Sequence, residues 1–273
     1  MVKYIAEIGI NHQGDVELAK RLITGAKFSG CDCVKFQKRN PEVCVPRDQW
    51  DMERETPFGR LKYIDYKRRM EFGNDEYNNI SDHADKLEIP WFASVWDIDS
   101  AEFMAQRTNM CKVPSAKMKD IELLRKVNDL FEFVVISTGM CDEQDVETAV
   151  SIVHPNVIMH SVGSYPTEYN NLNLGYIKYL KHKYGEIADI GYSGHECGFS
   201  AAFVAVAFGA TWIERHITID RDMIGSDHKS SIDGGELFYM IQNIKKLEKA
   251  LNGEGPRDIL DCEASKITTL RGT

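Results

Sequence analysis

Two histidines near the C-terminal end of the chain have the type and spacing of a metal-binding pair. His195 ends one strand-like run, and His216 lies in the next run, 21 residues later. Neutral imidazole is a good ligand for divalent first-row ions, whose open positions then take water or substrate oxygens. We therefore predict that His195 and His216 bind one metal ion. A satisfied core histidine is the alternative for either residue alone.

Two lysines upstream lie in apolar surroundings. Lys35 and Lys112 each stand between two apolar residues of a strand-like run. A buried ammonium group without a partner is strongly unfavourable or loses its proton, and a bound anion removes that penalty. We expect the two lysines to bind a phosphate or a carboxylate. An ion pair with Glu7 or Glu214 is the alternative that the sequence leaves open.

Eight strand-like runs alternate with helical stretches along the chain. The runs are apolar on both faces, as expected of a parallel sheet that helices cover. Eight strands, each followed by a helix, predict an α/β fold with a single (β/α)8 TIM barrel. A doubly wound open sheet is the alternative, but residues 9–14 lack the glycine-rich phosphate loop that usually follows its first strand. The runs cover residues 4–11, 33–38, 91–96, 110–116, 133–139, 157–163, 189–195 and 212–218.

The stretches between these runs predict the helices and one insertion. Apolar residues recur at spacings of three and four in residues 16–28, with Asp15 as the expected N-cap and Gly30 as the stop. Residues 38–75 are too long for an ordinary loop, so we expect an elaborated insertion on the active face after the second strand. Further helices are expected over residues 76–87, 121–130 and 235–251. We predict one barrel domain over residues 1–273, in which residues 255–273 form a tail.

Reactive side chains of such a barrel come from the carboxyl ends of its strands. Three hydroxyls there, those of Ser115, Ser137 and Ser193, suit phosphate oxygens, although each alone has the plain interpretation of a strand-end hydroxyl. Asp227 follows the last strand and is expected to hold substrate hydroxyls or to move a proton, with a simple turn as the alternative. The other strand-end residues of interest are Glu7, Lys35, Gln37, Lys112, Tyr165, His195, Glu214 and His216.

Composition limits the classes of function. The formal net charge is −9 and no long basic run is present, so we do not expect nucleic acid as a partner. The longest apolar stretch, residues 201–210, is about half of what a membrane span requires, and we expect no signal peptide. Seven cysteines without a CxxC pair predict reduced thiols in a cytoplasmic protein.

Seven motifs follow one another in a recognisable order. They are AEIGINHQG at residues 6–14, VKFQ at 34–37, KVPS at 112–115, ISTGM at 136–140, YPT at 165–167, GYSGH at 191–195 and ERHIT at 214–218. Their order and spacing resemble those of the N-acetylneuraminate (sialic acid) synthase family over residues 3–250. The resemblance implies a (β/α)8 barrel that uses Mn(II) or Mg(II). Its reaction would join phosphoenolpyruvate to an N-acylated hexosamine such as N-acetylmannosamine, giving a nonulosonic acid and phosphate.

The resemblance also implies roles for individual residues. The metal ligands would be His195 and His216. Phosphoenolpyruvate would be bound by Lys35, Lys112, Ser115, Ser137 and Ser193. The sugar would be bound by Gln37, Tyr165 and Asp227. The catalytic residues would be Glu7, Glu214 and Asp227, with Glu7 or Glu214 stabilising positive charge at C2 of the enol phosphate after the attack.

The sequence departs from the family pattern in three places. Lys117 stands where many members have an acidic residue, which puts sugar specificity or a proton transfer in question. Residues 161–164 read SVGS where many members have Cys-Thr-Ser, so a phosphate contact is expected to be missing. The sequence also stops about where typical members continue into an antifreeze-like domain that supplies an arginine to a partner's sugar site. We therefore expect a different acceptor, a separate capping chain, or an open and slow site, in a homodimer formed through outer helices.

Two other functions stay compatible with the sequence. One is another synthase that condenses phosphoenolpyruvate with an aldose to make an eight- or seven-carbon keto acid, which the accepted aldose length would distinguish. The other is a non-catalytic, sugar-phosphate-binding partner subunit, which would bind its ligand without releasing phosphate. The residue at 117 and the expected lack of a cap suggest this second alternative, whereas the histidine pair, the two lysines, Glu7 and Glu214 argue against it.

Overall fold

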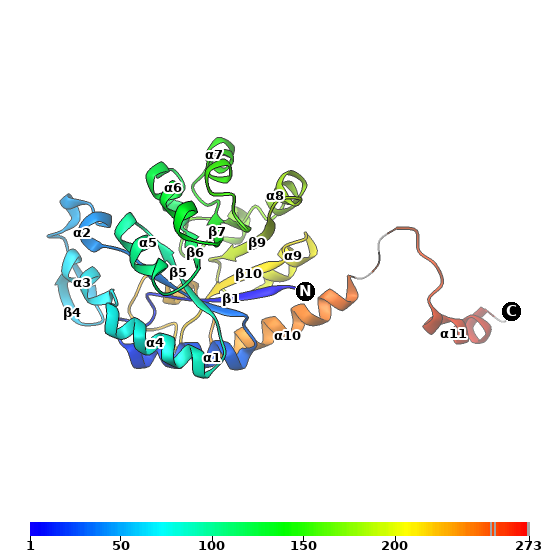
Figure 1. Cartoon of the computed structure of the whole chain (residues 1–273). Helices are drawn as coiled ribbons and strands as arrows, with labels where there is room; N and C mark the ends of the chain where they lie inside the picture. The colour runs from blue at the N-terminus through cyan, green and yellow to red at the C-terminus, as the bar shows by residue number, and fades with distance from the viewer. Residues whose placement is uncertain (252, 254, 272–273) are drawn as a thin grey trace.

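A computed structural model gives the structure of residues 1–251, 253 and 255–271 (Figure 1). Eight parallel strands close into one barrel in the order β1-β10-β9-β8-β7-β6-β5-β2, which confirms the predicted (β/α)8 fold. Each of the eight predicted runs coincides with one of these strands. They are β1 (Lys3–Gly9), β2 (Cys33–Lys38), β5 (Trp91–Val95), β6 (Met110–Val113), β7 (Phe133–Ser137), β8 (Val157–Ser161), β9 (Asp189–Gly194) and β10 (Trp212–His216).

The strand register places reactive side chains of neighbouring strands side by side. Glu7 of β1 is paired with Lys35 of β2 on one side and with His216 of β10 on the other. Glu214 of β10 is paired with Ser193 of β9. Side chains that share a level on adjacent parallel strands point to the same face of the sheet. The register therefore gathers these five residues inside the barrel.

Helices surround the barrel and begin and end at local sequence signals. The first, α1 (Val16–Ser29), begins after Asp15, whose carboxylate accepts the N–H groups of Glu17 and Leu18. It ends at Gly30, where φ is 97°, a conformation that glycine adopts without strain. The other helices around the barrel, all within two residues of their predicted ends where predicted, are α4 (Asn74–Lys86), α5 (Ile98–Ala105), α6 (Ile121–Leu130), α7 (Glu143–Val153), α8 (Tyr176–Tyr184), α9 (Ser200–Ala207) and α10 (Gly234–Ala250).

The barrel interior has an apolar lower layer and a polar upper layer. A large hydrophobic core fills the space between the strands and the surrounding helices. A second, smaller cluster fills the lower interior and consists of Ile5, Cys33, Phe92, Val135, Val157 and Met159. The polar strand residues follow these in the chain, at the carboxyl ends, where barrel enzymes carry their reactive groups.

The segment between β2 and α4 forms the predicted insertion, seen at the left of Figure 1. Two of its side chains, Tyr66 and Met70, pack against Ile10 in the loop after β1. This contact fixes the insertion at the rim of the barrel mouth. Its elements are α2 (Pro41–Cys44), a short 3-10 turn (Arg47–Gln49), the antiparallel hairpin β3 (Glu53–Thr56) and β4 (Gly59–Lys62), and α3 (Tyr63–Met70).

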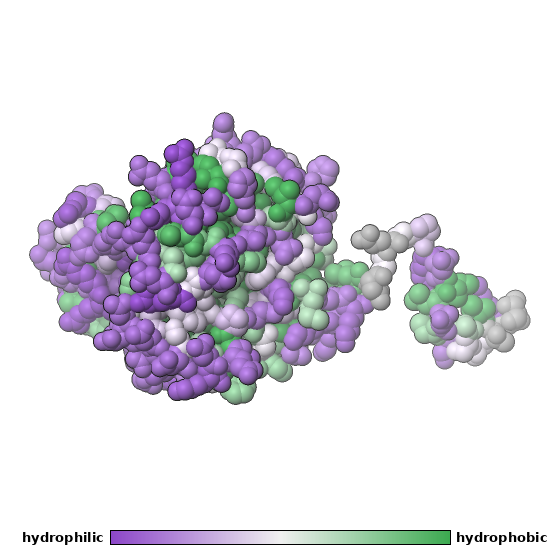
Figure 2. Space-filling view, viewed as in Figure 1, coloured by the Kyte–Doolittle hydropathy of each residue, from purple (hydrophilic) through white to green (hydrophobic). Residues whose placement is uncertain are grey.

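The last helix, α11 (Asp261–Arg271), lies apart from the barrel beyond α10 (Figure 1). The face in Figure 2 is mainly hydrophilic over the barrel, whereas the region around α11 shows hydrophobic residues, and Ile259, Leu260 and Leu270 are exposed there. Of the residues described, none in α11 belongs to the hydrophobic core. Across residues 1–251, 253 and 255–271, no helix is long and apolar enough to cross a membrane.

Candidate active site

A cavity of about 130 Å³ opens at the carboxyl ends of the barrel strands. It brings together eleven of the twelve predicted site residues, and the exception is Asp227, which lies just beyond the lining. The predicted residues in the lining are Glu7, Lys35, Gln37, Lys112, Ser115, Ser137, Tyr165, Ser193, His195, Glu214 and His216. The lining also includes Ser94, Trp96, Pro114, Ala116, Met140, Ser161 and Gly163, which sequence reasoning had not assigned to the site.

The two lysines are paired with the two glutamates at the bottom of the cavity. Lys35 Nζ lies 2.7 Å from Glu7 Oε2 and 3.6 Å from Glu214 Oε1, and Lys112 Nζ lies 2.7 Å from Glu214 Oε1. All four side chains are buried. The ion pairs that the sequence left open as an alternative are thus present. The binding of an anion by the lysines stays a prediction.

Burial and charge act in opposition on these groups. Burial alone would lower the pKa of Lys35, but the carboxylates of Glu214 and Glu7 outweigh it and the pKa is raised. Burial lowers the pKa of Lys112, and the Glu214 carboxylate offsets only part of this because Lys35 adds repulsion. Burial raises the pKa of Glu214, yet Lys112 and Lys35 together hold it below its usual range. This four-residue set, the inner layer, therefore balances two ammonium groups against two carboxylates.

Hydroxyl groups stand around the inner layer. Ser193 donates a hydrogen bond of 2.9 Å to Glu214 Oε1, and Lys35 donates one of 2.9 Å to Ser94 Oγ. Ser161 Oγ accepts the Gly139 N–H at 3.1 Å and lies 3.2 Å from Ser115 Oγ. The Ser137 hydroxyl is buried and has no hydrogen-bond partner among the residues described. The Ser137 hydroxyl is therefore free to bind an incoming substrate oxygen.

The two predicted metal ligands lie next to each other in the cavity lining, with ring centroids 5.5 Å apart and ring planes tilted by 51°. His195 Nδ1 lies 2.9 Å from the carbonyl oxygen of Val162, so Nδ1 carries the proton and Nε2 keeps its lone pair. Burial, followed by the neighbouring His216, lowers the pKa of His195 to about 3. His195 is therefore neutral, the form that binds metal ions.

His216 is also available as a ligand. Its Nδ1 is buried and makes no hydrogen bond within the described part of the chain. No group of three or more His, Cys, Asp or Glu side chains that could hold a metal ion occurs within residues 1–251, 253 and 255–271. The pair thus fits an ion that completes its coordination with water or substrate oxygens.

A buried ion pair outside the cavity fixes the loops that carry the histidines. The guanidinium group of Arg215 pairs with the carboxylate of Glu196 and donates to the backbone oxygens of Glu196 and Gly198, each at 2.7 Å. Tyr192 Oη donates to the same carboxylate at 2.8 Å. Arg215 and Glu196 are fully buried. They connect β10 to the segment that follows His195, a role that sequence reasoning did not find because both are ordinary charged residues in the pattern.

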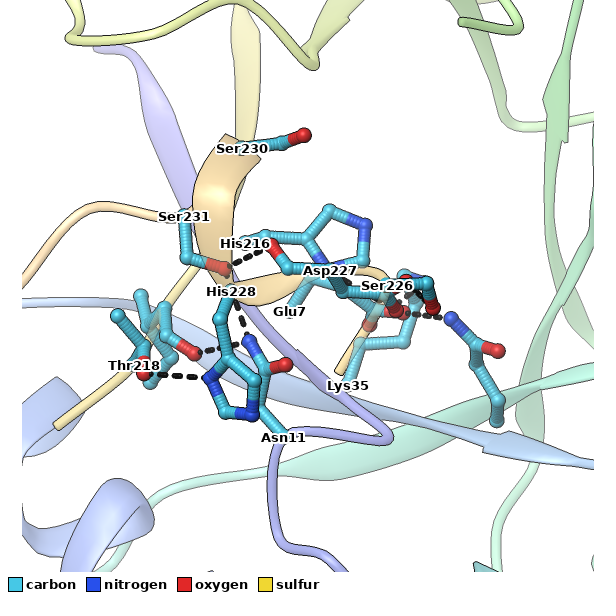
Figure 3. A network of polar contacts seen from close by, with 12 residues as sticks. Glu7, Asn11, Lys35, His216, Thr218, Ser226, Asp227, His228, Ser230 and Ser231 are labelled. Carbon is cyan, nitrogen blue, oxygen red and sulfur yellow. Dashed lines mark hydrogen bonds and ion pairs between the residues drawn. The ribbon is translucent and has the colours of Figure 1, made fainter. Parts of the chain in front are cut away.

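Asp227 lies at the rim of the site, in the loop after β10. Its Oδ2 is 3.8 Å from His216 Nδ1, and its Oδ1 accepts the Ser226 hydroxyl at 2.6 Å. Asn11 donates to Ser231 Oγ at 2.8 Å, and Ser231 donates to the backbone oxygen of Asp227 at 2.7 Å (Figure 3). This hydrogen-bond chain holds the Asp227 loop against the end of β1.

Comparison with known proteins assigns the chain to a family. The NeuB family model matches residues 22–255. The chain belongs to the NeuB family. The N-acetylneuraminate-9-phosphate synthase of Drosophila melanogaster is 39% identical over 95% of this chain and 71% of its own length. The N,N'-diacetyllegionaminic acid synthase of Campylobacter jejuni is 30% identical over 98% of this chain and 82% of its own.

A solved structure agrees with this assignment. The crystal structure of an N-acetylneuraminic acid synthetase from Leptospira borgpetersenii, in complex with citrate, matches with a TM-score of 0.86 and 30% identity. The match covers 100% of this chain and 93% of that one. These findings confirm the expected family, the barrel and the class of enzyme, a sialic acid synthase-like transferase.

The structure locates the two departures from the NeuB family motifs, Lys117 and residues 161–164, relative to the cavity. Lys117, in a 3-10 turn after β6, has its Nζ 3.7 Å from Asp120 Oδ2 and is absent from the cavity lining. The charge reversal therefore puts no cation into the cavity. In the 161–164 segment, a hydroxyl group still faces the cavity at Ser161. Its place in register with Ser193 is the signal that could have identified it.

Proposed function

We propose that this NeuB-family enzyme condenses phosphoenolpyruvate with the open-chain aldehyde of an N-acylated hexosamine, such as N-acetylmannosamine, to give a nonulosonic acid and phosphate. The observation that carries the proposal is one cavity that combines two buried lysines, several hydroxyl groups, of which that of Ser137 has no partner among the described residues, and two neighbouring histidines. Phosphoenolpyruvate needs the first two features because it carries close to three negative charges. The aldehyde needs the third.

In this proposal, phosphoenolpyruvate displaces part of the inner-layer ion pairing. Lys35 and Lys112 bind its phosphate and carboxylate groups, together with the hydroxyls of Ser115, Ser137 and Ser193. Glu7 and Glu214 stay close to the bound anion because each is paired with one of the lysines that contact the anion. Buried charges of both signs around the reacting carbons give a preorganised, water-poor environment for charge that develops during the reaction.

The chemistry balances without a redox partner. C3 of phosphoenolpyruvate attacks the aldehyde carbon, a carbon–carbon bond forms, and the aldehyde oxygen takes up a proton. Positive charge then develops at C2, where the carboxylate of Glu7 or Glu214 stabilises it until water adds. The resulting tetrahedral intermediate expels phosphate and becomes the 2-keto acid. Asp227, beside His216, is placed to hold a sugar hydroxyl or to pass the proton.

A divalent ion, Mn(II) or Mg(II), completes the proposal. His195 and His216 would hold it through neutral imidazole nitrogens, and it would supply Lewis-acid polarisation of the aldehyde oxygen. The Val162 carbonyl fixes the His195 tautomer needed for this. Gln37, Tyr165 and Asp227 would bind the sugar. The Tyr165 ring already lies against His195, with centroids 4.1 Å apart.

The surroundings of the enzyme belong to the same proposal. Seven free thiols fit a cytoplasmic location. The exposed side chains of Phe238 and Tyr239 on α10 offer apolar area for a homodimer that uses outer helices. We further propose a single barrel domain, whose site is closed by the partner copy or by a separate capping chain.

Phosphate release from phosphoenolpyruvate tests the proposed function directly. The assay contains Mn(II) and one aldose from a panel of N-acetylmannosamine, 2,4-diacetamido hexoses, arabinose 5-phosphate and erythrose 4-phosphate. We expect release with an N-acylated hexosamine, abolished by EDTA and by His216→Ala. Release only with arabinose 5-phosphate or erythrose 4-phosphate would instead establish a synthase for shorter keto acids. Binding of phosphoenolpyruvate with no release under any condition would contradict the proposed catalysis.

A further inference from the structure

The side-chain amide of Gln37 stands between a cation and a carboxylate of the active site. Gln37 lies near the end of β2 and lines the cavity, and its Nε2 donates a hydrogen bond of 3.0 Å to Glu7 Oε1. Its Oε1 accepts a hydrogen bond from the guanidinium group of Arg39. A guanidinium group can only donate and a carboxylate can only accept, so these two partners together allow a single orientation of the amide. Gln37 therefore presents an N–H group to Glu7 and its oxygen to Arg39.

Two further side chains hold Arg39 in place. Its Nε lies 3.2 Å from Glu71 Oε1, and its guanidinium carbon lies 4.7 Å from the ring centre of Trp96. The backbone N–H of Arg39 donates to the other carboxylate oxygen of Glu71 at 3.2 Å. The side chains of Arg39 and Glu71 are only 10% and 9% exposed. A guanidinium group restrained by an ion pair and an aromatic ring can hold the amide that it contacts.

The contact between Arg39 and Glu71 also closes the insertion. Arg39 directly follows β2, and Glu71 directly follows α3, so the ion pair joins the two ends of the inserted segment. Arg39 is itself absent from the cavity lining, whereas Gln37 belongs to it. Any influence of Arg39 on the reacting groups therefore passes through Gln37.

Gln37 supports the Glu7 carboxylate in a way that differs from the support of Glu214. Glu7 Oε2 lies 2.7 Å from Lys35 Nζ, so one lysine and one neutral amide hold its two oxygens. Glu214 Oε1 has two lysines near it, Lys112 at 2.7 Å and Lys35 at 3.6 Å. A neutral donor orients a carboxylate without cancelling its charge. Glu7 thus keeps both a fixed direction and a negative charge, which are what stabilisation of a developing positive charge requires.

We propose that Arg39 and Gln37 are positioning residues for Glu7. Arg39 holds the Gln37 amide, and the amide holds the Glu7 carboxylate toward the positive charge that develops at C2 of phosphoenolpyruvate. This inference rests on the proposed function. The second amide N–H of Gln37 stays available to a sugar oxygen, so positioning adds to the sugar binding proposed above. The ion pair of Arg39 and Glu71 at the ends of the insertion then belongs to the support of the reacting groups.

A double-mutant cycle on phosphate release tests this arrangement, with saturating phosphoenolpyruvate, Mn(II) and an aldose that the parent accepts. Gln37→Met has nearly the same size but no donor, and should lower kcat by about 10- to 150-fold, as expected for the loss of a hydrogen bond to a charged group. Arg39→Met should lower kcat by about 10-fold, the low end of that range, with little change in the KM of phosphoenolpyruvate. The double variant should be no slower than Gln37→Met, because Arg39 acts through Gln37.

Two further variants guard against a purely structural explanation. The control is Arg107→Met, whose guanidinium group also lies over a ring, that of Phe103 at 3.8 Å, and also donates to an amide oxygen, that of Asn74. It should leave kcat unchanged. If Arg39→Met alone does not fold, Arg39→Met combined with Glu71→Gln removes both charges of the ion pair and takes its place in the cycle.

The amide protons of Gln37 give a readout that needs no turnover. In a chain labelled with the heavy isotope of nitrogen, their NMR signal is the one that disappears in Gln37→Met. We expect their exchange with water to be slow in the parent and in Arg107→Met, and faster in Arg39→Met. If no aldose supports phosphate release but exchange is faster in Arg39→Met, the positioning arrangement stands and the proposed catalysis fails. If phosphate is released but the two single losses in kcat multiply in the double variant, or exchange is unchanged in Arg39→Met, the positioning role is overturned while the proposed catalysis stands.

Discussion

The inner layer and the rim of this active site hold their cations in opposite ways. In the inner layer, Lys35 and Lys112 each lie 2.7 Å from a carboxylate oxygen, and every side chain comes from a barrel strand. At the rim, Lys67 comes from an inserted helix and has aromatic rings as its neighbours in place of a carboxylate. The inner layer is complete without substrate. The barrel strands thus pair their buried cations with carboxylates, whereas the insertion holds its cation against aromatic rings.

Substitution of one lysine in each region is the strongest test of this comparison. Lys112→Met leaves the buried Glu214 carboxylate short of its nearest partner, and loss of one member of a buried ion pair costs about 3–5 kcal/mol. Lys67→Met removes a buried charge that has no carboxylate partner, so we expect no loss of folding stability. Urea unfolding at pH 7 measures both.

A double variant controls for the interpretation of the Lys112 result. Lys112→Met combined with Glu214→Gln should recover part of the free energy of unfolding, because the orphaned charge is removed, but should not recover phosphate release. Equal destabilisation by Lys112→Met and Lys67→Met would show that the two regions hold their cations alike, against our description.

Addition of Mn(II) tests whether His216 is a metal ligand and whether its neighbour Asp227 is not. A ligand that binds only the folded state stabilises it by about 2.7 kcal/mol at a concentration of 100 times its Kd. We expect Mn(II) to raise the Tm of the parent accordingly, EDTA to reverse the effect, and His216→Ala to abolish it. Asp227→Asn should keep most of the shift, since Asp227 lies 3.8 Å from the His216 ring nitrogen. A Mn(II) shift that survives in His216→Ala would place the ion elsewhere.

We expect low pH to reduce the folding stability through His12, which lies in the loop after β1. His12 stacks on Phe72 with ring centroids 4.0 Å apart, and its Nδ1 accepts the Gly14 N–H at 3.0 Å. Burial, followed by Arg39, lowers the pKa of His12 to about 3, whereas the unfolded chain titrates near 6.5. Because the unfolded state takes up this proton first, stability is lost as the pH falls below 6.5, by about 2 kcal/mol at pH 5.

The His12 contribution is measured as a difference between two chains. Urea unfolding of the parent and of His12→Asn at pH 7 and pH 5 gives the pH dependence of each. We expect a smaller loss in His12→Asn. An equal loss in both chains would mean that His12 is not responsible for the acid sensitivity.

The smallest effect is expected at Lys117, which belongs to neither region. Its contact with Asp120 is a partly exposed ion pair, a type worth at most about 1 kcal/mol. Lys117→Gln should therefore change the free energy of unfolding by less than about 1 kcal/mol and leave the acceptor preference unaltered. A large change in that preference, measured by phosphate release, would show that Lys117 does contribute to the site.

The sequence was more informative about the inner layer than about the rim. Apolar runs with single polar residues at their ends are local patterns, so Lys35, Lys112 and His216 could be assigned to strand ends before their surroundings were known. Which carboxylate pairs with which lysine depends on contacts such as that between Lys112 and Glu214, 102 positions apart. No local pattern encodes such a contact.

The rim was missed because insertions have no repeating pattern from which side-chain direction follows. The basic stretch that contains Lys67 looks like a solvated helix face in the sequence. Its burial depends on how α3 packs against Ile10 through Tyr66 and Met70. The same limit applies to Arg215 and Glu196, whose pairing requires two loops to meet.

The pairing of the inner-layer lysines also bears on how the site empties after each turnover. Two lysines without partners would retain inorganic phosphate strongly, and product departure would then be slow. If the lysines bind phosphate as proposed, Glu7 and Glu214, each 2.7 Å from a lysine, would compete for the same ammonium groups and pair with them again as the phosphate leaves. The carboxylates would thus shorten the residence time of the inorganic product, an effect separate from any part they play in bond formation.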